Sequence, residues 1–288
     1  MLKLTVYNIL IFIALGNASF IEKSNFTILT SEEIANCELE NSANELDTDS
    51  VNRINGGRPV ELIVPYQVSL QVLRRGRYHH FCSGSIISPQ HVLTAAHCVT
   101  KMNPNEISVV AGTLTWRYGG DRHGVAAMRS HPGFSSSSLI INDIAVLKVT
   151  PSFNLARTSI SIISLGSRAR VGENVAVRLT GWGSLTPTGS SGLPERLQML
   201  DYQTISNKEC AQSGFRITAN ELCALGERGH GACVGDSGGP LTISNGTPQL
   251  VGIVSYGTAT CAQGRPDVYT RVSSFLPYIN RVISSEIP

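Results

Sequence analysis

The heptapeptide YQVSLQV, at residues 66–72, alternates strictly between apolar or aromatic side chains and polar ones. Successive side chains of a β-strand point to opposite faces of its sheet, so this two-residue period predicts a half-buried strand. Tyr66, Val68, Leu70 and Val72 would face a core, and the intervening Gln and Ser residues would face water. The stretch therefore predicts a fold built from β-sheets.

Further short apolar runs, separated by Gly, Pro, Ser and Asn, occupy residues 85–87, 108–111, 144–149, 175–179, 250–254 and 268–272. Asn245-Gly246, between the apolar runs 241–243 and 250–254, predicts a hairpin with a type I′ turn. Only residues 275–283 show helical spacing. Many short strands and one late helix, from Ile54 to the end of the chain, predict an all-β fold of two antiparallel barrels.

The first twenty residues carry a targeting signal. Lys3 precedes an apolar run from Val6 to Leu15, and Gly16 and Ala18 are the small residues typical of a signal-peptidase site. The run is shorter than the ~20 apolar residues that a helix needs to cross a membrane. We therefore expect residues 1–18 to be a signal peptide, and the protein to be secreted and extracellular without a stable membrane anchor.

Residues 19–53 form an acidic segment. They hold eight Asp and Glu residues against Lys23 and Arg53, a net charge of −6. The remainder from Ile54 holds 20 Lys and Arg residues against 13 Asp and Glu residues, a net charge of +7. The segment is polar and has little periodicity, which is typical of a flexible extension. We interpret it as an acidic propeptide of the domain at 54–288; the alternative is a plain linker.

Seven cysteines in a secreted chain indicate disulfides with one cysteine left over. No CxxC pair is present, so the spacing does not suggest a metal site. Cys37 stands alone in the acidic segment, where it would be a free thiol, form an intermolecular bridge or remain linked to the domain. The six other cysteines lie in the domain: Cys82, Cys98, Cys210, Cys223, Cys233 and Cys261.

Three segments carry residue types suited to nucleophilic catalysis: TAAHC at 94–98, NDIAVL at 142–147 and GDSGGP at 235–240. Each alone has an ordinary interpretation as a polar histidine, a turn aspartate or a glycine-rich loop. Together they supply a nucleophile, a base and an orienting carboxylate. A serine hydroxyl needs an adjacent base such as imidazole to take its proton, and a buried carboxylate holds that imidazole in the required tautomer.

With GWG at 181–183 and the segment 266–272, these motifs resemble the chymotrypsin/trypsin family over residues 54–288. The resemblance implies two six-stranded barrels, with a boundary near residue 165 and the active site in the cleft between them. It implies His97 as general base, Asp143 as its orienting carboxylate and Ser237 as nucleophile. It also implies an oxyanion hole made by the N–H groups of Gly235 and Ser237.

The same resemblance implies the disulfides Cys82–Cys98, Cys210–Cys223 and Cys233–Cys261. It implies a monomer that acts on polypeptide substrates and meets protein protease inhibitors. No cofactor, metal or nucleic acid is expected.

The segment RINGG at 53–57 resembles the family's activation site. A trypsin-like protease would cut after Arg53, and the freed Ile54 ammonium would pair with Asp236. An isolated buried charge is costly, so each of these two charges needs the other. The pair would order the loop that presents the Gly235 N–H. The alternative is that Arg53 is an incidental exposed residue.

The resemblance also places the specificity pocket. Gly231 falls at its base with Ala232 next to it, and Ser255, Tyr256 and Gly257 form the strand segment on which substrate docks.

Asp267 falls on the opposite wall of this pocket, an arrangement that resembles the crustacean collagenolytic serine proteases. We expect mixed specificity, with Lys and Arg accepted together with bulky or apolar residues. The alternative is that Asp267 points into a turn or meets an internal partner.

Asn25 and Asn245 begin N-glycosylation sequons, which suggests a glycoprotein. The main alternative function is a catalytically weak or inactive protease homologue that acts as a secreted binding or cofactor protein.

Overall fold

The computed structural model describes residues 56–137, 139–166, 171–189 and 192–285. The expected signal peptide, the acidic segment with Asn25 and Cys37, and the expected activation bond between Arg53 and Ile54 lie outside the described residues.

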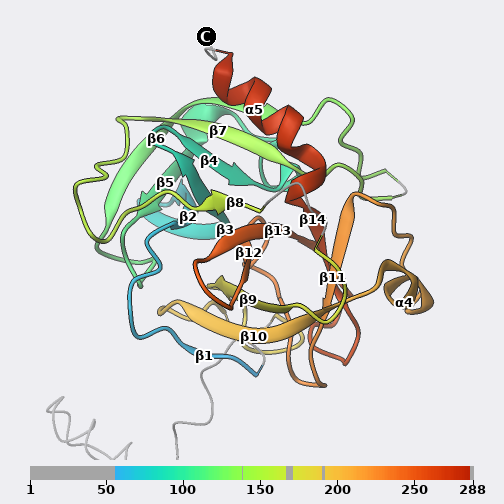
Figure 1. Ribbon diagram of the computed structural model, residues 1–288. Coiled ribbons are helices and arrows are strands. Elements are labelled where there is room, and N and C mark those ends of the chain that lie inside the picture. The colour runs from blue at the N-terminus through green and yellow to red at the C-terminus, as the bar shows by residue number, and fades with distance from the viewer. Residues whose placement is uncertain (1–55, 138, 167–170, 190–191, 286–288) are drawn as a thin grey trace, which may run out of the picture. The chain divides into compact units, whose positions relative to one another are not determined.

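Six antiparallel strands form the first closed barrel (Figure 1). In order around the barrel they are β2 (Gln67–Arg74), β3 (Arg77–Ser88), β4 (His91–Thr94), β7 (Ala145–Thr150), β6 (Asp121–Ser130) and β5 (Ile107–Ala111). Val68, Leu93 and Leu147 are fully buried in its core. Burial of such alternating apolar side chains, at about 25 cal/mol per Å² of apolar surface, is the main force that closes the barrel.

Six further strands close the second barrel, because β9 pairs with both β10 and β12. In order they are β9 (Ala176–Gly181), β10 (Gln198–Ile205), β11 (Glu221–Leu225), β14 (Asp267–Arg271), β13 (Gln249–Tyr256) and β12 (Pro240–Ile243). Two short strands lie at its margin: β1 (Arg58–Pro59) pairs with β10, and β8 (Ser164–Leu165) pairs in parallel with β13.

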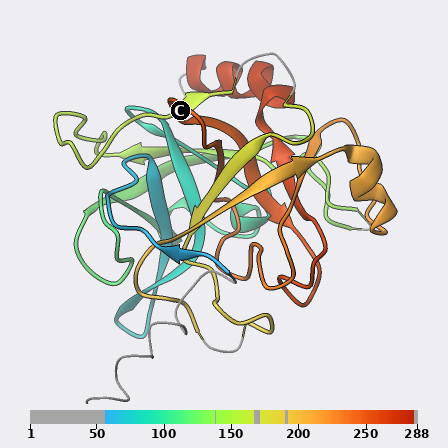
Figure 2. The same ribbon diagram turned by 60° about the horizontal axis from the view of Figure 1, so that its bottom comes forward.

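Figures 1 and 2 show the two barrels side by side, the first in blue to green and the second in yellow to red. The prediction of two six-stranded antiparallel barrels is confirmed. The chain passes from the first barrel to the second between β7 and β9, and residue 165 lies in this connection.

The C-terminal helix α5 (Leu276–Ser284) follows the short 3₁₀ helix η3 (Val272–Phe275). Its buried residues Ile279 and Val282 pack into the core of the first barrel, although the helix follows the last strand of the second. The predicted C-terminal helix is therefore confirmed, and it joins the two barrels.

Among the described residues, four short helical turns were not predicted: α3 (Ala96–Val99), η2 (Pro104–Glu106), α4 (Asn207–Gln212) and η3. None is long enough to show a hydrophobic period.

The strand that opened the sequence analysis is buried on both faces, so the expectation of a half-buried strand is wrong. Gln67, Ser69 and Gln71 are 1%, 0% and 0% exposed. Gln67 Oε1 accepts a hydrogen bond of 2.8 Å from Thr180 Oγ1 on β9. The second barrel thus provides the partner of Gln67, whereas Ser69 bonds to His80 of β3 and Gln71 donates to the Trp116 carbonyl. Protein groups replace water as the hydrogen-bond partners of this face.

The hairpin β12–β13 forms as predicted, but the expected type I′ turn is wrong. Five residues connect the two strands, and only Gly246 has a positive φ, of 86°. A type I′ turn needs positive φ at both central residues. Ser244 N instead donates to Ala176 O of β9, and Pro248 has no N–H with which to close a tighter loop.

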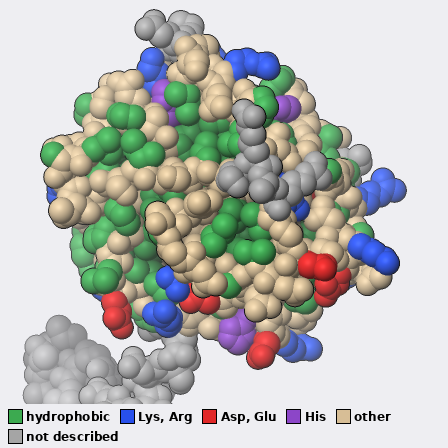
Figure 3. Space-filling view, viewed as in Figure 1, with side chains coloured by type: hydrophobic (Ala, Val, Ile, Leu, Met, Phe, Trp, Pro, Cys, Tyr) green, Lys and Arg blue, Asp and Glu red, His purple; other side chains and the backbone are tan. Residues whose placement is uncertain are grey.

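The face shown in Figure 3 has its charged side chains mainly around the rim, with uncharged side chains across the middle. Both signs of charge occur there, so this face carries no single-sign patch.

Candidate active site

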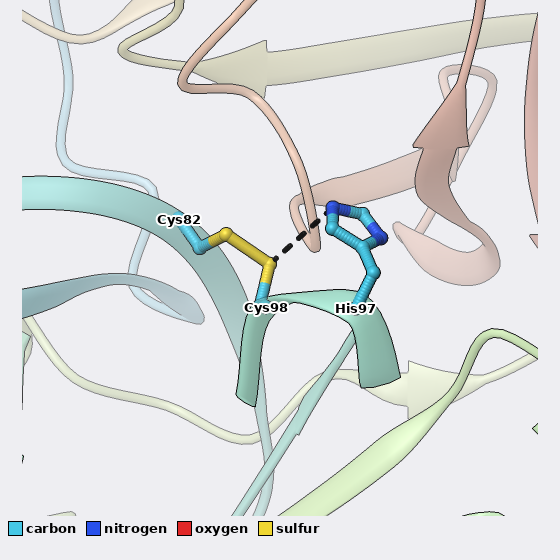
Figure 4. Close-up of side chains that lie close together, drawn as sticks. All are labelled: Cys82, His97 and Cys98. Carbon is cyan, nitrogen blue, oxygen red and sulfur yellow. Dashed lines mark hydrogen bonds between the residues drawn. A yellow bond between two sulfur atoms is a disulfide. The ribbon is translucent and has the colours of Figure 1, made fainter. Parts of the chain in front are cut away.

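His97 lies on α3, which follows β4 and is tied to β3 by the disulfide Cys82–Cys98. Figure 4 shows the imidazole ring beside this disulfide, with a ring nitrogen directed at Cys98. His97 Nε2 lies 3.7 Å from Cys98 Sγ, and because that sulfur is in a disulfide the contact is weak. The turn and the disulfide together fix the backbone of the histidine.

Asp143 orients His97 through two hydrogen bonds. Its Oδ1 accepts from the backbone N–H of His97 at 2.8 Å, and its Oδ2 accepts from His97 Nδ1 at 2.7 Å. The carboxylate is 2% exposed. Because an ionised carboxylate can only accept, Nδ1 carries the proton, and in the neutral ring Nε2 is left with its lone pair free.

Two side chains of the second barrel hold Asp143 in place. Ser255 Oγ, on β13, donates to Asp143 Oδ2 at 2.6 Å, and Thr270 Oγ1, on β14, donates to the Asp143 carbonyl at 2.7 Å. We expected Ser255 only on the substrate-docking segment and had no expectation for Thr270. No local sequence pattern signals either contact, because each spans more than 100 residues.

The segment that carries Ser237 packs tightly against the histidine segment. Ser83 N donates to Ser237 O at 2.7 Å. A Cβ on Gly238, whose φ is 76°, would lie 2.2 Å from Thr94 Oγ1 and 2.5 Å from Ser83 O. Only glycine fits there, and its absent side chain brings the serine beside α3.

Ser237 Oγ makes no hydrogen bond to His97 Nε2 within the part of the chain that the structure describes. Such catalytic hydrogen bonds are often long without substrate and tighten when it binds.

Gly235 has a φ of 103°, a conformation that other residues rarely adopt. A Cβ there would lie 2.8 Å from Leu193 Cδ2 and 3.1 Å from Gly183 Cα. The N–H groups of Gly235 and Ser237 donate no hydrogen bond within the described residues. Two backbone donors therefore remain available beside the serine.

His80 supports this loop from behind, a contact that the sequence analysis missed. The ring lies 2.8 Å from Gly235 O through Nε2 and 2.7 Å from Ser69 Oγ through Nδ1. A carbonyl only accepts, so Nε2 carries the proton and Nδ1 accepts from the serine. Burial lowers the pKa of His80 to about 4, partly offset by the bond to Gly235, so the ring is neutral.

Asp236 is fully buried next to the serine. Its carboxylate accepts from Gly183 N at 2.8 Å and from Cys233 N at 2.9 Å. Burial raises its pKa to about 6, and these two N–H groups act in the opposite direction. Among the residues that the structure describes, no cation forms an ion pair with it.

A cavity of about 210 Å³ opens beside Ser237. Its lining includes Ala232, Val234, Tyr256, Gly257, the disulfide Cys233–Cys261 and Asp267.

Asp267, at the start of β14, is 8% exposed, and its Oδ2 accepts from Ala232 N at 2.7 Å. A Cβ on Gly231 would lie 3.0 Å from the same oxygen, and a Cβ on Gly257 would lie 3.1 Å from Oδ1. The structure thus brings the expected pocket residues together, with Asp267 facing the cavity and a backbone N–H as its internal partner.

One grouping of potential metal ligands occurs among the described residues: Cys82, His97 and Cys98, whose ligand atoms lie within 4.8 Å of one another. Both cysteines form the disulfide seen in Figure 4, so neither offers a thiolate. The grouping does not fit a metal. The other two disulfides, Cys210–Cys223 and Cys233–Cys261, lie in the second barrel and its loops.

Two closed six-stranded barrels, with histidine, aspartate and serine segments brought together by contacts between them, are typical of the trypsin fold. The Trypsin family model matches residues 54–279. The chain is 35% identical over 232 residues to trypsin delta of Drosophila melanogaster, covering 79% of this chain and 87% of that protein.

It is 36% identical over 236 residues to trypsin Blo t 3 of Blomia tropicalis, covering 78% of this chain and 84% of that protein. The chain therefore belongs to the trypsin family and is a serine endopeptidase. Within the described ranges, no helix is long and apolar enough to span a bilayer.

The buried, neutral His80 makes stability depend on pH. Its pKa lies at about 4 in the folded protein and at 6.5 in the unfolded chain, so between these values only the unfolded chain takes up the proton. The contribution of His80 to the free energy of unfolding is therefore constant above pH 6.5 and falls by up to about 3 kcal/mol as the pH falls to 4.

We expect His80→Asn to remove this pH-dependent contribution to the free energy of unfolding. The difference in the free energy of urea unfolding between wild type and variant, both carrying Ser237→Ala to prevent self-digestion, should shrink from pH 7.5 to pH 4.5. Other titrating groups, such as Asp236 and Asp267, cancel from that difference. The exposed neighbour His79, changed to Asn, is the matched control. An equal pH effect in both variants would contradict the assignment.

Proposed function

We propose that this endopeptidase cleaves peptide bonds through His97, Asp143 and Ser237. The observation that carries the proposal is the 2.7 Å contact between His97 Nδ1 and Asp143 Oδ2 on a turn packed against the Ser237 segment. It leaves Nε2 as the basic atom of the ring. The free N–H groups of Gly235 and Ser237 add the donors that an oxyanion needs.

In this mechanism, Ser237 Oγ attacks the carbonyl carbon of the scissile bond while His97 Nε2 takes the hydroxyl proton. The negative charge that develops on the carbonyl oxygen is stabilised by the N–H groups of Gly235 and Ser237. His97 then gives its proton to the leaving amine as the C–N bond breaks, and an acyl-enzyme remains. Water then attacks the acyl carbon while His97 Nε2 takes a proton from it. His97 gives this proton to Ser237 Oγ as the ester bond breaks, which releases the acid and restores the serine.

Asp143 stabilises the imidazolium that forms on His97, and Ser255 and Thr270 keep the carboxylate in position for this. His80 is a positioning residue, because its bond to Gly235 O fixes the peptide next to the oxyanion donors.

We expect Ser237→Ala to lose peptidase activity by about a million-fold, because the nucleophile is absent. Chain cleaved after Arg53 should be labelled by a fluorophosphonate probe, and cleaved Ser237→Ala should not. A partly exposed serine outside the cavity lining, changed as Ser213→Ala, is the matched control and should keep the label. Lack of labelling in the cleaved wild type would instead favour an inactive homologue that acts as a binding protein.

The protein would be secreted as a zymogen and activated by cleavage after Arg53. Two observations support this proposal. The match to the Trypsin family begins at residue 54. Asp236 is a fully buried carboxylate without a cation among the described residues, and such a charge is costly until it is paired. The new ammonium of Ile54 would neutralise it and hold the Gly235 loop.

We expect Arg53→Gln to give a folded, secreted and inactive protein, because the bond after residue 53 would no longer be cut by a trypsin-like protease. Arg53→Lys is the matched control and should still be activated. The measurement is hydrolysis of a peptide substrate before and after treatment with trypsin. Full activity of Arg53→Gln would refute the switch.

Substrates would be polypeptides cut after Lys and Arg as well as after bulky apolar residues. Proteases of this family act on such chains and are regulated by protein inhibitors. Asp267 in the cavity wall supports the basic preference, because a buried carboxylate favours a cationic side chain. The space left by Gly231 and Gly257 supports the preference for bulky apolar residues.

We expect Asp267→Gly to lower cleavage after Lys and Arg by roughly 30-fold or more, since it removes one partner of a desolvated charge pair. Cleavage after apolar residues should persist. A peptide-library profile of the activated enzyme measures both. An unchanged profile would show that Asp267 does not set the specificity.

A further inference from the structure

We propose that Asp267 makes side-chain selection in this pocket depend on pH, with its neutral carboxyl favouring apolar residues and its carboxylate favouring Lys and Arg. The proposal rests on the proposed use of the cavity beside Ser237 for the residue on the acyl side of the scissile bond. Beyond that function, the preference of the enzyme between basic and apolar residues would shift within the physiological pH range.

The cavity offers a single group that can change its charge near neutral pH. Its lining contains Asp267 and Tyr256 as titratable side chains, because Cys233 and Cys261 form a disulfide. Burial raises the pKa of Tyr256 to about 12, so its hydroxyl stays neutral. The electrostatic character of the cavity therefore follows the charge of Asp267.

The carboxylate form of Asp267 is poorly stabilised. Asp267 is 8% exposed and accepts a hydrogen bond from the Ala232 N–H. Two or three backbone N–H donors can hold a carboxylate ionised by lowering its pKa strongly, and Asp267 accepts from one. Among the described residues no cation pairs with it.

The pKa of Asp267 is consequently raised to about 7. Burial is the largest cause, the charge of Asp236 raises it further, and the Ala232 N–H acts in the opposite direction.

The remaining charged or titratable groups of the surrounding elements are engaged elsewhere. Glu221 on β11 accepts from Thr218, Arg228 donates to Gln263, and Arg265 donates to Ser213 O. The ring of His230 lies against Gly56, away from the cavity lining, and its buried Nδ1 has no hydrogen-bond partner among the described residues.

Activation would change the effect of Asp236 on the pKa of Asp267 and leave the effect of burial. An Ile54 ammonium paired with Asp236 would offset the charge of that neighbour, whereas the burial of Asp267 does not depend on Ile54. Since burial is the first cause of the raised pKa, Asp267 should still titrate well above the ordinary range for aspartate in the cleaved enzyme.

The direction of the effect follows from the charge. Below its pKa, Asp267 is neutral and the cavity accepts uncharged side chains, with a cationic one losing its partner. Above its pKa, the carboxylate attracts Lys and Arg and must be desolvated by an apolar side chain. A cation that enters at low pH must first displace the proton of Asp267.

The test compares two substrates on the same activated enzyme. The ratio of kcat/KM for a peptide with Arg before the scissile bond to kcat/KM for its Leu counterpart is measured from pH 5.5 to 8.5. Any effect of pH on the chemical step that is common to both substrates cancels from the ratio. We expect the ratio to rise by about tenfold or more and to level off above neutral pH.

Asp267→Asn keeps the shape of the side chain and an oxygen for the Ala232 N–H, but it cannot titrate. We expect its ratio to stay constant within about twofold over the same range. A flat ratio in the wild type, or the same rise in Asp267→Asn, would overturn the proposal.

A second measurement needs binding alone. Benzamidine is a cation throughout this range, so its binding at pH 6 should release close to one proton from the wild type, and almost none at pH 8.5. Calorimetry in buffers of different ionisation enthalpy counts these protons, and Asp267→Asn should release none at either pH. Absence of proton release that depends on Asp267, or of benzamidine binding, would refute the inference. Failure of Ser237 labelling would refute the proposed catalysis and leave this result intact.

Discussion

The buried carboxylate of Asp143 is the group on which the active site depends. It comes from the first barrel and fixes the tautomer of His97 on the same barrel, while Ser255 and Thr270 of the second barrel donate to it. A buried carboxylate is stable only when its lone pairs are satisfied, so its burial requires both barrels to be in place. Folding of the junction between the barrels therefore also orients His97.

Close approach of backbones holds the Ser237 segment against the His97 segment. Gly238 lies where any side chain would collide with Thr94, and Gly235 adopts a conformation that directs its carbonyl to His80. The neutral ring of His80 links this carbonyl to Ser69, on the polar face of β2. The polar face of β2, which the sequence pattern assigns to water, thus supports the Gly235 loop.

Two buried carboxylates near the serine remain without cations among the described residues, and under the proposed function each is completed by a different event. Asp236 would gain its partner from cleavage of the chain, and Asp267 from a basic substrate. Burial raises the pKa of both groups. Under the same proposals, the cost of burying an unpaired carboxylate would leave the uncleaved site incomplete and make the cavity beside Ser237 responsive to charge.

The sequence by itself determined the β-strand periods, the late helix and the three motifs that contain His97, Asp143 and Ser237, because these depend on neighbours along the chain. Tertiary structure alone decided that Gln67 is buried, that the loop after β12 is not a type I′ turn, that His80 supports Gly235 and that Ser255 holds Asp143. Each of these depends on a partner from a distant segment. The local pattern fixes which face a side chain takes, but burial and hydrogen bonding depend on what the closed barrels place against that face.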